Sequence, residues 1–422
     1  MKHVILGNGP AGVIAAEAIR KHAPADEIVL VGDEPEPPYS RMAIPYLLSG
    51  SIAEPGTYLR KGAAHFERLR IRQLADRARA VNTAARKVVL EKGGDLAYER
   101  LLIATGSQPA RLPTPGADLA GVHSCWTLAD ARRIMELARP SARVVQIGAG
   151  FIGCIILEAL ASRGVSLSVV EMGDRMVPRM MGQGAGGMIK RWVESKGIKV
   201  YTSTRVEAIE HDASGALAVR LSNGERVLAD LVISATGVKP NVEFLAGSGI
   251  ECSHGVLADA RLRTSVEGIY TAGDCAEAFD AVLGRHVVSA IQPNAADQAH
   301  CAALNMVGRS FALQCVTQIN VLDTLGLISS SFGNWEGVAG GDHAERQDDV
   351  NHRFIRLEFD GDRLVGANTI GLTEHLGVLR GLIQSRVALG PWKRQLMADP
   401  MALSEAYLAS AQAQSNWGRK AA

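Results

Sequence analysis

Two glycine-rich turns, each set directly between an apolar strand and a helix, constrain the fold of this chain more than any other feature. The first turn, GNGPAG at residues 7–12, follows an apolar segment at 3–6 and precedes an expected helix at 11–22. The second turn, GAGFIG at residues 148–153, follows the apolar segment 143–147 and opens a further helix. The repetition predicts an α/β chain with two Rossmann-like, doubly wound nucleotide-binding units.

Each glycine of such a turn has a distinct physical task. The first permits a tight bend, the second lets the backbone approach a pyrophosphate, and the third allows the helix to pack closely on the strand. The helix N-terminus adds free N–H groups and the positive end of its dipole. The residues assigned to phosphate binding are Gly7, Gly9, Pro10, Ala11 and Gly12 in the first turn, and Gly148, Gly150, Phe151, Ile152 and Gly153 in the second.

An acidic residue follows each turn at the end of the next strand. Asp33 lies about 20 residues after the first turn, where a carboxylate can bond a ribose hydroxyl. Glu171 ends the corresponding strand of the second unit. A carboxylate there accepts hydrogen bonds from the ribose hydroxyls and repels a 2′-phosphate, so we expect NADH to be preferred over NADPH. Arg175 lies nearby in the sequence and could instead favour NADPH.

Further apolar stretches end in the same kinds of turn. Segments 101–106 and 232–237 both end in Ala-Thr-Gly, and segment 269–274 ends in Gly-Asp, before a helix expected to start at 293–295. Two dinucleotide sites in one chain suggest one bound flavin and one diffusing nicotinamide nucleotide.

Composition excludes several other functions. The chain carries 45 Lys and Arg against 44 Asp and Glu, so its net charge of +1 gives no reason to expect nucleic acid or an anionic membrane as a partner. No run of 18 apolar residues and no signal-peptide pattern is present, and a soluble, cytoplasmic protein is therefore expected. The six cysteines form no C-x-x-C pair, which speaks against a metal site or a local redox dithiol.

In this order the motifs resemble the pyridine nucleotide–disulfide oxidoreductase superfamily of FAD- and NAD(P)-binding flavoproteins. The loop EPEPPYSR at 34–41 is similar to that of the rubredoxin and ferredoxin reductases and of the flavin module of NADH-dependent nitrite reductases. The resemblance implies a discontinuous FAD-binding domain (1–112 and 241–312), an NAD(P)-binding domain (113–240) and a C-terminal α+β interface domain (313–422). Within the last, residues 337–351 are expected to form a polar, exposed loop, and the end of the chain after Ala409 is expected to fray.

The resemblance also implies site residues beyond the two turns. For FAD these are Asp33, Arg41, Ala78 near the adenine, Thr105, Gly106, Gly273, Asp274 at the ribitol or phosphate, and Pro293, Asn294 and Ala295 facing the flavin pyrimidine. For NAD they are Glu171, Thr236 and Gly237.

The sequence departs from the family at four informative positions. Met42 stands where some members carry a redox-active cysteine, and a thioether cannot form a thiolate or a mixed disulfide, so we expect electrons to leave FAD directly. Tyr46 and Ile155 stand where ferredoxin reductases usually carry a Lys and a Glu. Both halves of that ion pair are missing, which predicts a less polar lining beside the nicotinamide and flavin. Trp126 replaces a frequent Arg.

Three functions remain open at this stage. The first is a reductase that takes hydride from NADH and passes electrons from FAD to an iron–sulfur protein of the ferredoxin or rubredoxin type. The second is a cysteine-free NADH oxidase or dehydrogenase whose acceptor is O2, a quinone or a small molecule. The third is a non-catalytic flavin-binding subunit of a larger complex. Either a monomer or a homodimer is compatible with the sequence.

Overall fold

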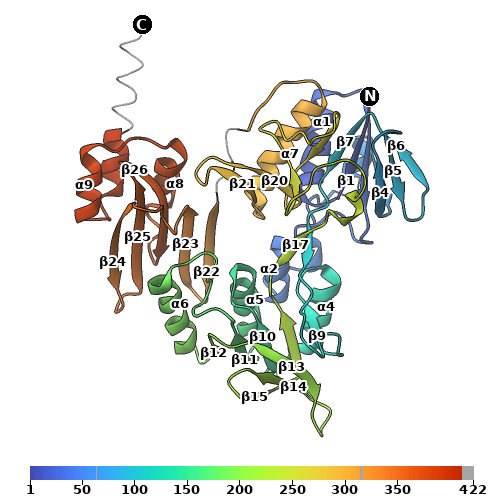
Figure 1. Ribbon diagram of the computed structural model, residues 1–422. Coiled ribbons are helices and arrows are strands. Elements are labelled where there is room, and N and C mark those ends of the chain that lie inside the picture. The colour runs from blue at the N-terminus through green and yellow to red at the C-terminus, as the bar shows by residue number, and fades with distance from the viewer. Residues whose placement is uncertain (63, 314–315, 317, 411–422) are drawn as a thin grey trace. The chain divides into compact units, whose positions relative to one another are not determined.

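The computed structural model describes residues 1–62, 64–313, 316 and 318–410, and contacts divide the chain into two compact units (Figure 1). The first unit contains Met1–Ala110, Trp126–Leu128 and Val238–Val316. The second contains Arg111–Cys125, Ala129–Gly237 and the described part of Thr317–Ala422. The chain therefore leaves the first unit and returns to it.

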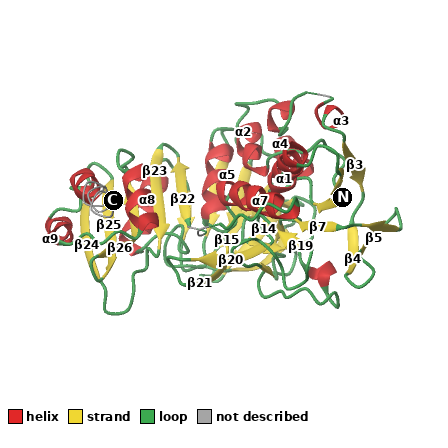
Figure 2. Ribbon diagram, turned by 90° about the horizontal axis from the view of Figure 1, so that it is seen from above, coloured by secondary structure: helices red, strands yellow, loops and turns green. Residues whose placement is uncertain are grey.

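The first unit is built on a parallel five-stranded sheet. Its strands, in spatial order, are β19 (Ile269–Thr271), β7 (Arg100–Ile103), β1 (Lys2–Leu6), β2 (Glu27–Gly32) and β3 (Ile71–Ala75). One face is covered by helices α1 (Pro10–His22) and α7 (Gln292–Met306), which pack side by side (Figures 1 and 2). Because side chains alternate along a strand, Ile5 and Leu30 face these helices, whereas Val4 and Val29 enter the core on the opposite face.

Smaller elements complete the first unit. They are the antiparallel strands β4 (Ala78–Asn82), β5 (Lys87–Leu90) and β6 (Asp95–Ala97), the pair β8 (Ser107–Pro109) and β17 (Val238–Pro240), the sheet β18 (Val256–Leu257), β20 (Ala276–Asp280) and β21 (Arg285–Val288), the short helices α2 (Ile44–Leu48) and α3 (His65–Arg68), and 3-10 turns at Arg41–Ala43, Glu54–Thr57 and Glu243–Leu245.

The second unit repeats the parallel architecture. Its sheet has the order β12 (Lys199–Tyr201), β11 (Ser166–Val170), β10 (Arg143–Ile147), β16 (Leu231–Ser234) and β9 (Val122–Ser124). Its other elements are α4 (Leu128–Leu137), α5 (Phe151–Ala161), α6 (Gln183–Ser195) and the antiparallel strands β13 (Val206–His211), β14 (Leu217–Leu221) and β15 (Arg226–Ala229). The predicted strand–turn–helix–strand repeat is thus confirmed in both units.

The C-terminal part of the second unit is an antiparallel sheet with two helices, drawn orange to red in Figure 1. The order is β22 (Ile319–Thr324), β23 (Leu327–Gly333), β26 (Arg363–Ile370), β25 (Arg353–Asp360) and β24 (Asp342–Asp348), followed by α8 (Leu376–Ser385) and α9 (Pro391–Ala398). Asn368 connects this sheet to the segment before α6, because its Nδ2 donates to the carbonyl of Met180 (3.0 Å) and its Oδ1 accepts from Gly182 N (3.0 Å).

The sequence expectation for residues 337–351 is wrong in part. An exposed loop was expected, but Asp342–Asp348 form β24, the edge strand paired with β25 along its whole length. Five of its seven residues are exposed, so its composition is polar although its backbone is in the sheet. The expected fraying after Ala409 concerns residues that lie almost entirely outside the described part.

Within the described residues, no helix combines the length and the apolar character needed to cross a lipid bilayer.

Candidate dinucleotide sites

The first glycine-rich turn has the geometry of a phosphate-binding turn. Gly7 has φ +108°, and a Cβ there would lie 2.0 Å from the carbonyl oxygen of Ala104. A Cβ at Gly12 would lie 1.8 Å from the carbonyl oxygen of Gly7, so α1 can approach β1 only because both residues are glycines. A Cβ at Gly9 would meet no protein atom within 4 Å. The space beside Gly9 is therefore open.

The second turn repeats this geometry. Gly148 has φ +102° and a Cβ there would lie 2.4 Å from the Ala235 carbonyl oxygen, while a Cβ at Gly153 would lie 2.4 Å from that of Gly148. Gly150, like Gly9, has open space where its Cβ would be. Both middle glycines are N-caps without a side-chain cap, and neither helix has an acidic residue in its first turn. The backbone N–H groups and the helix dipole are thus available to an anion, and both turns fit the pyrophosphate of a dinucleotide.

Glu171 is held firmly at the second turn. Its side chain is 9% exposed, its Oε2 accepts from Ala149 N (2.7 Å), and its Oε1 accepts from Gly173 N (2.7 Å). A carboxylate oxygen has two lone pairs, so each oxygen retains one for a ribose hydroxyl. The sequence predicts Glu171 as an NAD ligand, which stays a prediction, and it did not indicate that Glu171 braces the turn.

Arg175 is engaged elsewhere. Its Nε donates to the carbonyl of Met181 (2.8 Å), and its Nη1 contacts Asp174 Oδ1 (2.7 Å). The positive charge of Arg175 is therefore already balanced by Asp174 in the absence of a 2′-phosphate. The arrangement favours NADH at this turn, as the sequence predicted, and the assignment of individual ligands stays a prediction.

Asp33 differs from Glu171 in both register and environment. Gly7 N donates to the carbonyl of Val31 (2.8 Å), and Gly148 N donates to that of Val170 (2.8 Å). The position equivalent to Glu171 is therefore Gly32, and Asp33 lies one residue further. The Asp33 side chain is 42% exposed and forms an ion pair with Arg77 (2.8 Å).

The Ala-Thr-Gly turn after β7 is closed by a residue that the sequence did not single out. Thr105 Oγ1 donates to the carbonyl of Asn241 (2.7 Å), and Asn241 Nδ2 donates to that of Thr105 (3.0 Å). Asn241 N also donates to the carbonyl of Gly106 (2.9 Å). The corresponding turn after β16 places Thr236 beside Ser234 (Oγ1 to Oγ 3.4 Å) and gives Gly237 a φ of +116°.

Asp274, at the turn after β19, is a largely buried carboxyl group. Ser107 Oγ donates to its Oδ2 (2.9 Å), and Trp126 Nε1 donates to the carbonyl of Ser107 (3.0 Å). Burial raises the pKa of Asp274, against the opposing effects of the Ser107 hydrogen bond and the positive charge of Arg41.

Arg41 organises the loop that resembles the ferredoxin reductases. Its Nη2 pairs with Glu34 Oε1 (2.6 Å), and its Nη1 donates to Tyr39 OH (3.1 Å) and to the carbonyl of Trp126 (2.8 Å). Its guanidinium also lies 5.3 Å from the centroid of the Trp126 ring, a cation–π contact. Burial raises the pKa of Tyr39, whose hydroxyl donates to Glu34 Oε2 (2.6 Å). Arg41 thus connects Trp126 to the loop 34–41 within the first unit, and its expected role as a FAD ligand stays a prediction.

The remaining predicted FAD residues lie at the ends of elements. Pro293, Asn294 and Ala295 occupy the first turn of α7, where Asn294 Nδ2 donates to Ser289 Oγ (2.7 Å) and the neighbouring Gln292 accepts from Ser40 Oγ (2.9 Å). Ala78 begins β4. Their contacts with FAD stay a prediction.

Tyr46 and Ile155 belong to different units. Tyr46 lies on α2 and is 60% exposed, and Ile155 lies on α5 and is partly buried. Met42 is 48% exposed in the 3-10 turn before α2. Their place beside the nicotinamide stays a prediction.

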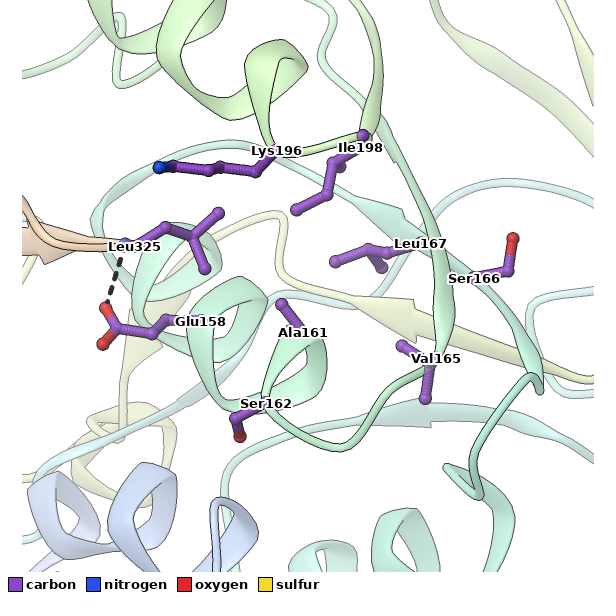
Figure 3. A pocket seen from close by; sticks show the side chains of 10 residues that line it. Glu158, Ala161, Ser162, Val165, Ser166, Leu167, Lys196, Ile198 and Leu325 are labelled. Carbon is purple, nitrogen blue, oxygen red and sulfur yellow. Dashed lines mark hydrogen bonds between the residues drawn. The ribbon is translucent and has the colours of Figure 1, made fainter.

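A hollow of the second unit lies away from the candidate NAD turn (Figure 3). Its lining includes Glu158, Ala161 and Ser162 at the C-terminal end of α5, whereas the turn is at the N-terminal end of that helix. Glu158 Oε2 accepts from Leu325 N (3.2 Å), the bond drawn in Figure 3. The hollow lies between the C-terminal end of α5 and the β22–β23 turn, and its lining contains none of the residues predicted to bind NAD.

Two turns with the geometry of phosphate-binding turns, each on its own Rossmann-type sheet, define the fold class of the dinucleotide-binding proteins. The sequence model of the family described as pyridine nucleotide-disulphide oxidoreductase matches residues 1–303. The chain belongs to this family, whose members bind FAD and use NADH as reductant. Its predicted family, α/β fold and oxidoreductase class are confirmed.

Several proteins are similar to this chain over nearly its whole length. The epsilon subunit of NADH-dependent phenylglyoxylate dehydrogenase from Aromatoleum evansii is 32% identical, covering 95% of this chain and 96% of the relative. Rhodocoxin reductase from Rhodococcus erythropolis is 30% identical, with 93% and 91% covered. The solved structure of a covalent putidaredoxin reductase–putidaredoxin complex matches with a TM-score of 0.89 at 25% identity, covering 97% of this chain and 99% of that one.

Proposed function

We propose that this protein is an NADH-dependent, FAD-containing reductase that passes electrons to a small iron–sulfur protein of the ferredoxin or rubredoxin type. The observation that carries the proposal is the pair of open glycine turns, at Gly9 and Gly150, in a chain without a cysteine at Met42. Similarity to rhodocoxin reductase and to putidaredoxin reductase supports the class of acceptor.

The chain's own residues would bind and orient the two nucleotides. The first turn, Asp274 and the start of α7 would hold FAD, and the helix N-terminus of α7 would stabilise negative charge on the reduced ring. The second turn and Glu171 would hold NADH by its adenosine half. When bound, flavin accepts two electrons as hydride and can release them singly, which suits a one-electron acceptor.

The test is a comparison of electron acceptors with purified protein. Anaerobic NADH should bleach the flavin absorbance, and reduction of cytochrome c should depend on added ferredoxin or rubredoxin. Rapid NADH consumption with O2 or a quinone alone, unchanged by added iron–sulfur protein, would instead support the oxidase alternative.

A second candidate is an NADH-oxidising subunit of a larger dehydrogenase, favoured by the full-length similarity to the phenylglyoxylate dehydrogenase subunit. In that case the protein isolated from its own host would elute with other subunits, and the free chain would be slow with every soluble iron–sulfur protein. As part of the first proposal we place the protein in the cytoplasm. The described cysteines are free thiols, which is the state expected in a reducing compartment.

A further inference from the structure

Gln298, on the buried face of α7, is a polar residue for which neither the sequence motifs nor the proposed chemistry accounts. Its side chain has no exposed surface. Its Oε1 accepts from the backbone N of Gly273 (2.8 Å). Its Nε2 is also buried and has no hydrogen-bond partner among the described residues.

A buried side-chain amide with a hydrogen bond to its oxygen but none to its nitrogen lowers the stability of the folded protein. A buried donor without an acceptor destabilises a fold, and an apolar residue in place of Gln298 would exchange the unpaired Nε2 for an unpaired Gly273 N–H, so the two costs would largely offset each other. The orientation of the amide is nevertheless fixed, since only Oε1 can accept from Gly273 N. Gln298 therefore retains an unfavourable group while holding one particular backbone N–H.

That backbone N–H belongs to Gly273, a residue in a left-handed conformation with little space around it. Gly273 has φ +82°, and a Cβ there would lie 3.2 Å from the Cβ of Ala11 and 3.8 Å from that of Ala295. The turn is thus enclosed between the start of α1 and the start of α7. The next residue is Asp274, whose carboxyl group is held by Ser107. Gln298 fixes the backbone from which this carboxyl group projects.

We propose that Gln298 is a positioning residue for FAD, which acts by holding the Gly273–Asp274 turn in its ligand-binding conformation rather than by stabilising the fold. The inference rests on the proposed placement of FAD at this turn.

The test separates ligand binding from stability. Gln298→Met preserves side-chain length and removes both the acceptor and the unpaired donor. We expect the FAD dissociation constant, measured by flavin fluorescence, to rise at least tenfold, while the urea midpoint of the FAD-free protein stays unchanged. An unchanged dissociation constant would overturn the proposal, and so would a loss of FAD-free stability large enough to explain the weaker binding.

Two further variants sharpen the result. Gln146→Met is the matched control, because Gln146 is also fully buried and its Nε2 donates to the carbonyl of Gly148 in the second unit (2.9 Å). It should leave FAD affinity unchanged, and an equal loss there would overturn the specific role of Gln298. Gln298→Glu keeps an oxygen that accepts from Gly273 N, and burial favours its neutral form at low pH, whereas ionisation at higher pH would place an unpaired negative charge in the buried turn. It should bind FAD nearly as wild type at pH 5.5 and more weakly at pH 8, whereas equally weak binding at both would contradict the proposal. Wild-type protein that binds no FAD would refute the placement of the cofactor itself.

Discussion

Gly32 and Glu171 occupy equivalent positions at the ends of β2 and β11, one residue after the carbonyls of Val31 and Val170 that accept from the first glycine of each turn. At the second turn the space is taken by the Glu171 carboxylate, which bonds Ala149 N. At the first turn a Cβ at Gly32 would lie 2.3 Å from the side chain of Asn8. The two turns thus share the same backbone hydrogen bond, but the neutral side chain of Asn8 lies beside Gly32 at the first turn, whereas the acidic side chain of Glu171 braces the second.

The glycines of the two turns should respond differently to substitution. Gly9→Val should give a folded protein without bound FAD, because its side chain would enter open space needed for the pyrophosphate. Gly12→Ala should lower the yield of folded protein, since its methyl group would overlap the Gly7 carbonyl. Circular dichroism and the flavin-to-protein absorbance ratio measure the two effects. Gly150→Val is the matched control and should retain FAD while losing NADH-dependent reduction. Stoichiometric flavin in Gly9→Val would contradict the assignment of the first turn.

Replacing Glu171 should change nucleotide preference and affinity together. Glu171→Ala removes a charge that repels a 2′-phosphate, and we expect the NADH-over-NADPH ratio in kcat/KM to fall about tenfold, equivalent to about 1.4 kcal/mol. Binding of both nucleotides should weaken, because Ala149 N loses its acceptor. Glu207→Ala, at an exposed position of the same unit, should change neither. A wild-type enzyme that reacts faster with NADPH would show that Glu171 does not set the preference.

The raised pKa of Asp274 predicts that the stability of the FAD-free protein depends on pH. Its pKa is raised in the folded state, so folding favours the protonated form. Its contribution to stability is therefore complete below the ordinary pKa of an aspartate and is lost as pH rises through the raised value. Urea unfolding of wild type and Asp274→Asn from pH 4 to 7 should show wild type losing stability relative to the variant as pH increases. Parallel curves for the two proteins would contradict the prediction.

Arg41→Lys should destabilise the first unit although charge is conserved. Lysine cannot supply two nitrogens to Glu34 and the Trp126 carbonyl in the same planar arrangement, and we expect a loss of about 1–2 kcal/mol in the free energy of unfolding. Tryptophan fluorescence during urea unfolding reports the change near Trp126. Arg79→Lys, in the exposed pair with Glu91, should cost less than about 0.5 kcal/mol. Equal effects of the two substitutions would show that the Trp126 contact contributes nothing.

The sequence predicted those parts of the site whose residues are consecutive in the chain. The residues 7–12 and 148–153 each specify strand, bend and helix within one local segment, and both were located correctly. Asn241 and Gln298 were missed because their partners, Thr105 and Gly273, are far away along the chain. No periodicity connects such residues. Only the folded sheet brings them together.

Strand β24 shows the complementary difficulty. Its polar sequence is typical of a loop. An edge strand that faces solvent can have such a sequence, because it needs few apolar side chains. Its identity depends on the backbone partner β25, which comes later in the sequence.

The division of the first unit into separate chain segments has a consequence for biosynthesis. Strand β19 and helix α7 complete the sheet and the turn that contains Asp274, yet they follow the whole of Ala129–Gly237. During synthesis on the ribosome, every strand of the parallel sheet in the second unit emerges before β19, the last strand of the parallel sheet in the first unit. The N-terminal segment must therefore wait, with β7 lacking its neighbour β19, while another unit is made. If the first turn binds FAD as proposed, the site that the N-terminal residues begin is complete for the cofactor only after β19 and α7 have been synthesised.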